Sequence, residues 1–183
     1  LYFNGQLLHG THASKLNSEA LDAFADTQRP YQAVDRIALP AHLHYQMPRR
    51  EVALAVQPLF PGLQACQLRA LLDSDIQALV LECFGGGTGP SENRELMTLL
   101  RQAHERGIVL LAISQCPHGA VNFGTYAAGS ALAACGLVSG AGLSREAALG
   151  KLFSLLGCGL DQTEVERLLV ADLCGELNGK QGS

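Results

Sequence analysis

Apolar residues follow two alternating patterns over the last two thirds of the chain. Continuous apolar runs, typical of buried strands, occupy residues 51–60, 76–84 and 108–115. Stretches with apolar residues three and four positions apart, typical of helices, occupy residues 63–72, 91–107, 125–136, 144–157 and 161–173. Apolar strands that alternate with helices indicate a parallel sheet with helices on both faces. The predicted fold class is therefore α/β.

Four residues are expected to mark the ends of these helices. Ser91, Ser144 and Asp161 each come directly before a helical stretch, where a short oxygen-bearing side chain can accept a hydrogen bond from the first turn. Gly107 follows the second stretch, and glycine readily takes the left-handed conformation that ends a helix.

The first 50 residues lack this regularity. Residues 1–8 predict a strand, with a turn or bulge at Asn4–Gly5, and a short helical or turn segment should follow and end near Phe24. Residues 27–50 carry three prolines, several charges and no sustained period. A compact domain rarely spends so many residues on one connection, so we expect a linker between residues 1–26 and residues 51–183.

Composition narrows the classes of partner. Apolar residues make up 48% of the chain and charged residues 16%, as in a compact globular protein. The net charge is −4, and no basic cluster beyond Arg49–Arg50 is available to contact phosphates, which argues against a nucleic acid partner. Apolar runs fall short of the roughly 18 residues that a membrane span needs, so no membrane partner is expected.

Six cysteines lie at wide spacings within apolar stretches. They are Cys66, Cys83, Cys116, Cys135, Cys158 and Cys174. Metal sites usually show close cysteine pairs, and small secreted domains show dense disulfide frameworks. We therefore expect buried core thiols in a cytoplasmic protein.

The loops after the predicted strands are where an α/β protein binds ligands. The loop at residues 85–90 is rich in glycine, but Pro90 stands where a dinucleotide loop needs its third glycine. Cys116 ends the third strand near His118, a spacing that neither places nor excludes a catalytic pair. The two histidine pairs, at 9 and 12 and at 42 and 44, lack a third ligand, so neither a metal nor an organic cofactor is expected.

Taken together, several blocks resemble the second half of a cytoplasmic type I L-asparaginase. They are LYFNGQLLHGTHASKLNSEALDAF, VALAVQPLFPG, ALVLECFGGGTGP, the long block from HERGIVLLAISQ to GKLFSLLG, and the closing LVADLCGEL. Their order and spacing follow this family over nearly the whole chain, departing mainly in the linker. The resemblance implies that residues 1–26 end an N-terminal catalytic domain and that residues 51–183 form a smaller C-terminal domain.

The resemblance also implies an amidohydrolase that converts L-asparagine to L-aspartate and ammonia without a cofactor. In this family the nucleophilic threonine lies in a TGGTI-like motif and a second threonine in an HGTDT-like motif. Neither motif occurs in these 183 residues, so this chain alone should be inactive and should need the N-terminal half as a partner. A homodimer or homotetramer is expected, and the preference for asparagine or glutamine stays open.

Lys15 is the counterpart of the family's active-site lysine, which follows the strand that LYFNGQLL matches. A threonine hydroxyl is a poor nucleophile at neutral pH and needs a base or a cation beside it. A lysine in a dry pocket can serve in either role, because burial lowers its pKa while a nearby carboxylate raises it. Sequence leaves its protonation state open.

Some family members resemble allosteric enzymes with a second asparagine site near the C-terminal domain. The matching positions are Ser14, Glu82, Thr88, Ser114 and Cys116. Glu82 departs from the family pattern, in which an arginine ends that strand, and an acid there would repel the carboxylate of an effector. Two other functions also stay open: a non-catalytic module for oligomerisation or small-ligand sensing, and the asparaginase-like subunit of a tRNA amidotransferase.

Overall fold

The computed structural model describes residues 1–26, 37–41, 43 and 50–177. Its centre is a four-stranded sheet in the order β5–β6–β7–β8, in which every neighbouring pair is parallel. The strands are β5 (Leu54–Pro58), β6 (Ala78–Cys83), β7 (Val109–Ser114) and β8 (Val138–Ser139). The predicted α/β class is confirmed. The apolar pattern does not predict β8, because two residues are too few to show a period.

The two central strands supply both layers of the core. β6 and β7 are buried along their whole length. Leu79 and Leu81 belong to one apolar cluster, whereas Val80 and Leu111 belong to the other. Successive side chains of a strand point to opposite faces, so a strand with a helical layer on each side must be apolar at every position.

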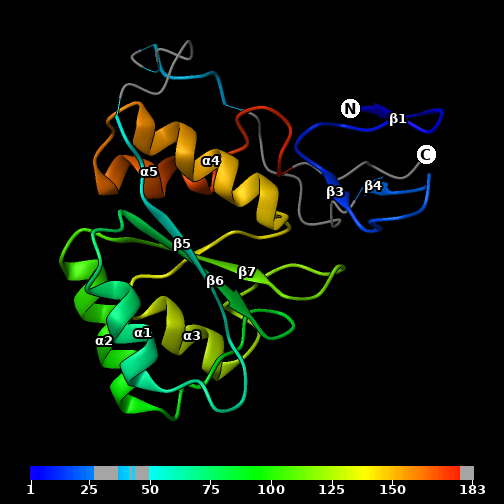
Figure 1. Ribbon diagram of the computed structural model, residues 1–183. Coiled ribbons are helices and arrows are strands. Elements are labelled where there is room, and N and C mark those ends of the chain that lie inside the picture. The colour runs from blue at the N-terminus through cyan, green and yellow to red at the C-terminus, as the bar shows by residue number, and fades with distance from the viewer. Residues whose placement is uncertain (27–36, 42, 44–49, 178–183) are drawn as a thin grey trace.

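Helices cover both faces of the sheet, as predicted (Figure 1). On one face lie α1 (Ala65–Leu72), α2 (Arg94–Glu105) and α3 (Ala127–Ala133). On the other lie α4 (Arg145–Gly157) and α5 (Gln162–Leu169). In the described part of the chain, no helix is both long and apolar enough to cross a membrane.

Helix ends follow the predicted caps with one exception. Three predicted positions are confirmed: Ser144, Asp161 and Gly107. The prediction that Ser91 is an N-cap is wrong, because α2 begins at Arg94 and the side chain of Asn93 accepts the hydrogen bond from Leu96 N at 3.1 Å. The residues just before Asn93 form a turn instead, in which Asn93 N donates to the carbonyl of Pro90.

The N-terminal segment consists of two small hairpins. The first pairs β1 (Tyr2–Phe3) with β2 (Gln6–Leu7), and the second pairs β3 (Ala13–Lys15) with β4 (Phe24–Asp26). The prediction of one strand over residues 1–8 is therefore wrong, whereas the turn at Asn4–Gly5 is confirmed. Both turn residues have positive φ, 48° and 75°, which matches the twist of a two-residue hairpin. The segment between β3 and Phe24 is an irregular loop with a bend at residues 18–21, and it contains no helix.

The expected linker at residues 27–50 falls mostly on residues outside the described ranges. Ile37, Leu43 and Arg50 are among its described residues. Leu43 packs into the apolar cluster beneath α4 and α5, and Ile37 lies against its edge.

Cysteine burial differs from the prediction. All six cysteines are present as thiols, but only Cys83 and Cys135 are fully buried. Cys66, Cys116 and Cys174 are exposed, so the prediction of core thiols is wrong for them. They lie on the outer face of α1, in the loop after β7 and in the C-terminal segment, respectively. A cysteine at such a position is exposed even when its neighbours in sequence are apolar.

Candidate functional site

Lys15 lies at the end of β3 with its side chain exposed. It is opposite Phe24 in the β3–β4 ladder, and the residue before it, Ser14, is buried. Because successive side chains of a strand point to opposite sides, Ser14 and Lys15 diverge. The Ser14 hydroxyl donates to Glu146 Oε2 at 2.8 Å, so Ser14 faces the C-terminal domain and Lys15 points away from it. Among the described residues, the Lys15 ammonium group has no hydrogen bond or ion pair.

The residue three positions before Lys15 is also a contact with the C-terminal domain. His12 is buried, and its Nε2 lies 2.6 Å from the carbonyl oxygen of Gly175. A carbonyl only accepts, so Nε2 carries a proton. On the other side of the ring, Nδ1 lies 3.6 Å from Asp26 Oδ2 in β4. His12 thus joins the second hairpin to the C-terminal end of the described chain.

The predicted effector residues gather at the carboxyl edge of the sheet and the start of α4. Glu82 is the second-last residue of β6 and is buried, and its two carboxylate oxygens accept from Arg145 Nε and Nη2 at 2.6 and 2.8 Å. Arg145 and Glu146 are consecutive residues in the first turn of α4. The structure therefore brings Glu82 and Ser14 together through neighbouring residues of one helix.

Three further predicted effector residues lie on the same edge: Ser114 is the last residue of β7, and Thr88 and Cys116 lie in the loops that follow β6 and β7. The Ser114 hydroxyl donates to the carbonyl of Gly85 at 2.7 Å and accepts from the backbone N–H of Cys116 at 3.1 Å. The Thr88 hydroxyl donates to the carbonyl of Phe84 at 3.2 Å. Strand alternation places Ser114 on the face toward α1 and α2, whereas Glu82 is on the face toward α4. Four of the five residues therefore lie at the carboxyl edge of the sheet, with Glu82 and Ser114 on opposite faces. Ser14 belongs to β3 and reaches this region only through its bond to Glu146 in α4.

Arg145 changes the electrostatics expected from Glu82. The bidentate hydrogen bonds from the guanidinium neutralise the buried carboxylate and raise the pKa of Arg145. The repulsion that Glu82 alone would exert on an anionic ligand is therefore offset. Sequence reasoning missed this pair because its members are 63 positions apart.

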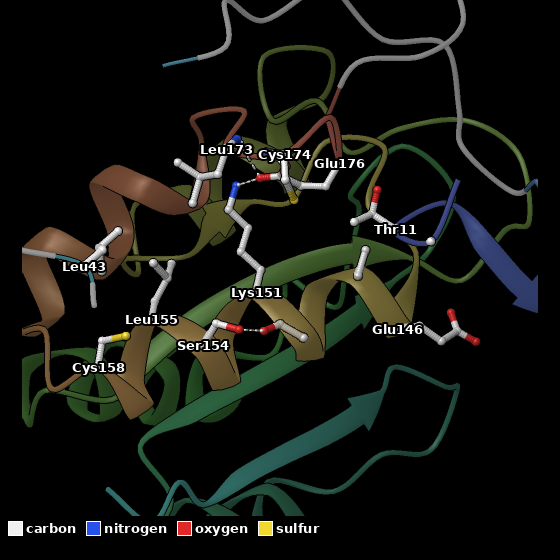
Figure 2. A pocket seen from close by; sticks show the side chains of 13 residues that line it. Thr11, Leu43, Glu146, Lys151, Ser154, Leu155, Cys158, Leu173, Cys174 and Glu176 are labelled. Atoms are coloured by element: carbon white, nitrogen blue, oxygen red, sulfur yellow. Dashed lines mark hydrogen bonds and ion pairs between the residues drawn. The ribbon is translucent and has the colours of Figure 1, made fainter. Parts of the chain in front are cut away.

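A cavity of about 370 Å³ lies between α4, the C-terminal segment and the loop at Gly10 and Thr11 (Figure 2). Its walls are mainly apolar and include Leu43, Leu155 and Leu173. Figure 2 shows that Lys151 extends from α4 toward Glu176. The cavity thus sits where the N-terminal segment meets the C-terminal domain.

Lys151 and Glu176 form a buried ion pair beside this cavity. The two side chains are 4% and 3% exposed, and Lys151 Nζ lies 2.6 Å from Glu176 Oε1. Burial by itself would raise the pKa of Glu176, but the Lys151 charge and backbone N–H donors lower it to about 2. Burial lowers the pKa of Lys151 against the opposing attraction of Glu176. One signal in the sequence was available: Lys151 stands four residues from Ala147 and from Leu155, on the apolar side of α4.

The side chains at these positions carry carboxylate, ammonium, guanidinium, hydroxyl, thiol and imidazole groups. Within the described ranges, no group of three or more His, Cys, Asp or Glu side chains is arranged to hold a metal ion. The chemistry that these residues can perform is hydrogen bonding, charge stabilisation and proton transfer.

A parallel sheet between two helical layers defines an α/β domain, and its polar groups lie at the carboxyl edge, where ligands bind in folds of this class. Residues 54–169 match the sequence model of the Glutaminase/Asparaginase C-terminal domain family, and the chain belongs to this family. It is 34% identical to L-asparaginase 1 of Escherichia coli K12 over 97% of this chain and 55% of that protein. It is 35% identical to the human 60 kDa lysophospholipase over 97% of this chain and 33% of that protein.

The fold is also similar to a solved asparaginase structure. The crystal structure of L-asparaginase I from Vibrio cholerae superimposes with a TM-score of 0.82 at 29% identity, over 97% of this chain and 57% of that one. The chain therefore spans about half the length of the asparaginases that it resembles. Its similarity to them extends through both the N-terminal hairpins and the C-terminal domain.

Proposed function

We propose that this chain is the C-terminal part of a two-domain amidohydrolase that converts L-asparagine to L-aspartate and ammonia. The family match and the similarity to two L-asparaginases over nearly the whole chain support this function. In this proposal, residues 1–26 end the N-terminal catalytic domain, residues 27–50 are the interdomain linker and residues 51–183 are the C-terminal domain. The nucleophilic threonine belongs to the half of the enzyme that this chain does not span.

The observation that carries the proposal is the orientation of Lys15. Its neighbour Ser14 is held against α4, so Lys15 is directed to the side of β3 opposite the C-terminal domain. That side is where an N-terminal half would complete the site. The large exposed side chains of Tyr2, Leu7 and Leu21 in the same segment are consistent with further chain packing there.

Lys15 would activate the threonine nucleophile in amide hydrolysis. The hydroxyl attacks the side-chain amide carbon of asparagine, and its proton must leave while the bond forms. An amine beside the hydroxyl either takes this proton or, as an ammonium, stabilises the developing alkoxide. The proton released by the hydroxyl passes to the amide nitrogen, the C–N bond breaks and ammonia departs. Water then hydrolyses the acyl-enzyme to aspartate and restores the hydroxyl. The reaction uses only organic acid, base and hydroxyl groups, so we propose no metal or organic cofactor.

We propose that the enzyme works as a cytoplasmic homodimer or homotetramer. Ser14, Glu82, Thr88, Ser114 and Cys116 stay the proposed residues of a small-ligand effector site. Four of them lie at the carboxyl edge of the sheet and Ser14 is bonded to the first turn of α4, which supports this proposal. The Glu82–Arg145 pair would offer both a carboxylate and a guanidinium to a zwitterionic amino acid.

Ammonia release by the full-length protein tests the proposed function. Asparagine, glutamine and a lysophosphatidylcholine are offered to the wild type, to Lys15→Ala and to Glu19→Ala. Glu19 is an exposed charged residue of the same segment and serves as the matched control. We expect asparagine turnover that falls by roughly 10³-fold or more in Lys15→Ala, because removing one member of a catalytic group disables the unit, and that is unchanged in Glu19→Ala.

One result would remove the proposed role of Lys15, and another would refute the proposed function. Turnover of asparagine by Lys15→Ala at the wild-type rate would remove Lys15 from the mechanism. Fatty acid release from lysophosphatidylcholine without ammonia release from either amide would favour a lysophospholipase, the activity in the name of the similar human protein.

A further inference from the structure

The C-terminal segment Asp172–Leu177, here called the strap, is held in shape by its own acidic side chains. Asp172 Oδ1 accepts from the backbone N–H groups of Gly175 at 2.8 Å and Leu177 at 3.4 Å. The Glu176 carboxylate accepts from the N–H groups of Leu173 at 3.1 Å and Cys174 at 2.8 Å. Side chains that satisfy buried backbone donors in this way give a short irregular segment a single conformation.

Lys151 fastens the strap to α4. Its ammonium group contacts Glu176 Oε1 at 2.6 Å and donates to the carbonyls of Leu169 at 2.9 Å and Ala171 at 2.5 Å. These three contacts use all the donors of the ammonium group. The strap is thereby fixed to the helix that packs directly on the sheet.

From this fixed position the strap contacts two segments that precede the C-terminal domain. The carbonyl of Gly175 accepts from His12 Nε2, and the carbonyl of Asp172 accepts from Ile37 N at 3.0 Å. Gly175 has φ of +95°, a conformation that residues with a side chain rarely adopt. Glycine at this position allows the carbonyl to face His12.

Polar contacts dominate the attachment of the segment that carries Lys15. Four of the first 26 residues are buried, namely Leu8, His12, Ser14 and Ala23. Two of these four are the side chains that bond to the strap and to Glu146. His12 and Ser14 lie on the same side of the chain, two positions apart, and together they set both the position of β3 and the direction in which Lys15 points.

We propose that the strap is a positioning element for Lys15, acting through the hydrogen bond between Gly175 and His12. This inference rests on the proposed catalytic role of Lys15. A residue that aligns an amine with a reacting hydroxyl acts mainly on the chemical step, because a displacement of about 1 Å can cost roughly 10²-fold in rate. His12 is then a positioning residue and not a catalytic one.

The test uses the full-length protein with His12→Ala, His12→Gln, Lys15→Ala and the control His104→Ala. His104 is a half-buried histidine paired with Glu166 at 2.9 Å between α2 and α5, remote from the N-terminal hairpins. Asparagine kinetics, thermal unfolding and hydrogen exchange of residues 9–16 are measured on each. Glutamine can donate one hydrogen bond to the Gly175 carbonyl, so His12→Gln tests rescue.

We expect kcat of His12→Ala to fall by roughly 10- to 100-fold with KM within about twofold, and residues 9–16 to exchange faster. His12→Gln should recover most of the lost kcat, and His104→Ala should keep wild-type kcat whatever its loss of Tm.

Three outcomes overturn the inference. Full turnover in His12→Ala beside an inactive Lys15→Ala removes the positioning role and leaves the proposed function standing. An equal loss of kcat in His104→Ala shows a general effect of destabilisation. Full turnover in Lys15→Ala removes Lys15 from the mechanism and the positioning role with it, whereas the proposed function itself fails only if the wild type releases no ammonia from asparagine.

Discussion

The C-terminal domain and the N-terminal hairpins are held together by different forces. In the domain, two apolar clusters on the faces of one sheet bury whole strands and helix faces. In residues 1–26, large apolar side chains such as Tyr2 and Leu7 are 71% and 80% exposed, and hydrogen bonds from His12 and Ser14 make the attachment. The domain is therefore stabilised by its own apolar core, whereas the position of the hairpins depends on hydrogen bonds to other parts of the chain.

Breaking the buried ion pair should have the largest effect on the domain. Glu176→Gln removes the nearest counter-charge of the buried Lys151 ammonium, so we expect a loss of about 3 to 5 kcal/mol in the free energy of unfolding. Urea unfolding followed by circular dichroism measures it. Glu164→Gln, in the exposed pair with Arg167, is the matched control and should cost at most about 1 kcal/mol. Equal costs for the two variants would contradict the structural role of the buried pair.

Truncating one leucine in each region should show the same difference in the free energy of unfolding. Leu111→Ala opens a cavity in the fully buried β7, and we expect it to cost about 2 to 5 kcal/mol. Leu7→Ala removes an exposed side chain and should change the stability of the 183-residue chain by no more than about 0.5 kcal/mol. The same unfolding experiment compares them. A cost above about 2 kcal/mol for Leu7→Ala would show that the first hairpin has a core of its own.

Acid should remove the stability that Glu176 contributes to the fold. The pKa of Glu176 is about 2 in the folded chain against a usual value of 4.5. The unfolded chain therefore binds the proton first as pH falls, and the stability that Glu176 contributes above pH 4.5 is lost progressively between pH 4.5 and 2. Unfolding midpoints measured across this range should fall less steeply for Glu176→Gln than for the wild type. Parallel slopes would mean that Glu176 does not titrate with the fold.

The smallest expected effect concerns the start of α2. Asn93→Ala removes the side-chain acceptor of Leu96 N and should cost about 1 kcal/mol. Ser91→Ala is the control, since the structure places no cap there, and it should cost less than about 0.5 kcal/mol. A larger loss of stability in Ser91→Ala than in Asn93→Ala would show that Ser91 is the N-cap of α2, as the sequence pattern predicts.

Prediction from sequence worked best where one local signal decides one local structure. The caps at Ser144 and Asp161 and the turn at Asn4–Gly5 depend on neighbouring residues only. The same reasoning failed for residues 1–8, where the strand breaks at that turn and pairs with itself. It also failed for Cys66, whose apolar neighbours in sequence point to the other side of α1.

The candidate site was accessible from sequence only in part. Resemblance to a family singled out Lys15 and the five possible effector residues, but it could not show which groups surround them. The pairing of Glu82 with Arg145 could not be seen in the sequence, because the two residues are 63 positions apart. His12 drew attention only as a weak metal candidate, and its bond to Gly175 joins residues 163 positions apart.

The apolar pattern by itself determined the α/β class, the parallel sheet and the order of its helices. A strand that is covered by helices on both faces needs apolar residues at nearly every position, and such a run is visible in the sequence. Only the tertiary structure decided which charges meet, how the strap is fastened and which way Lys15 points. A hydrophobic side chain is stabilised by any apolar surroundings, because the hydrophobic effect has no direction. An ion pair or a hydrogen bond needs a particular partner at a particular distance and angle, and the fold decides which partner is in reach.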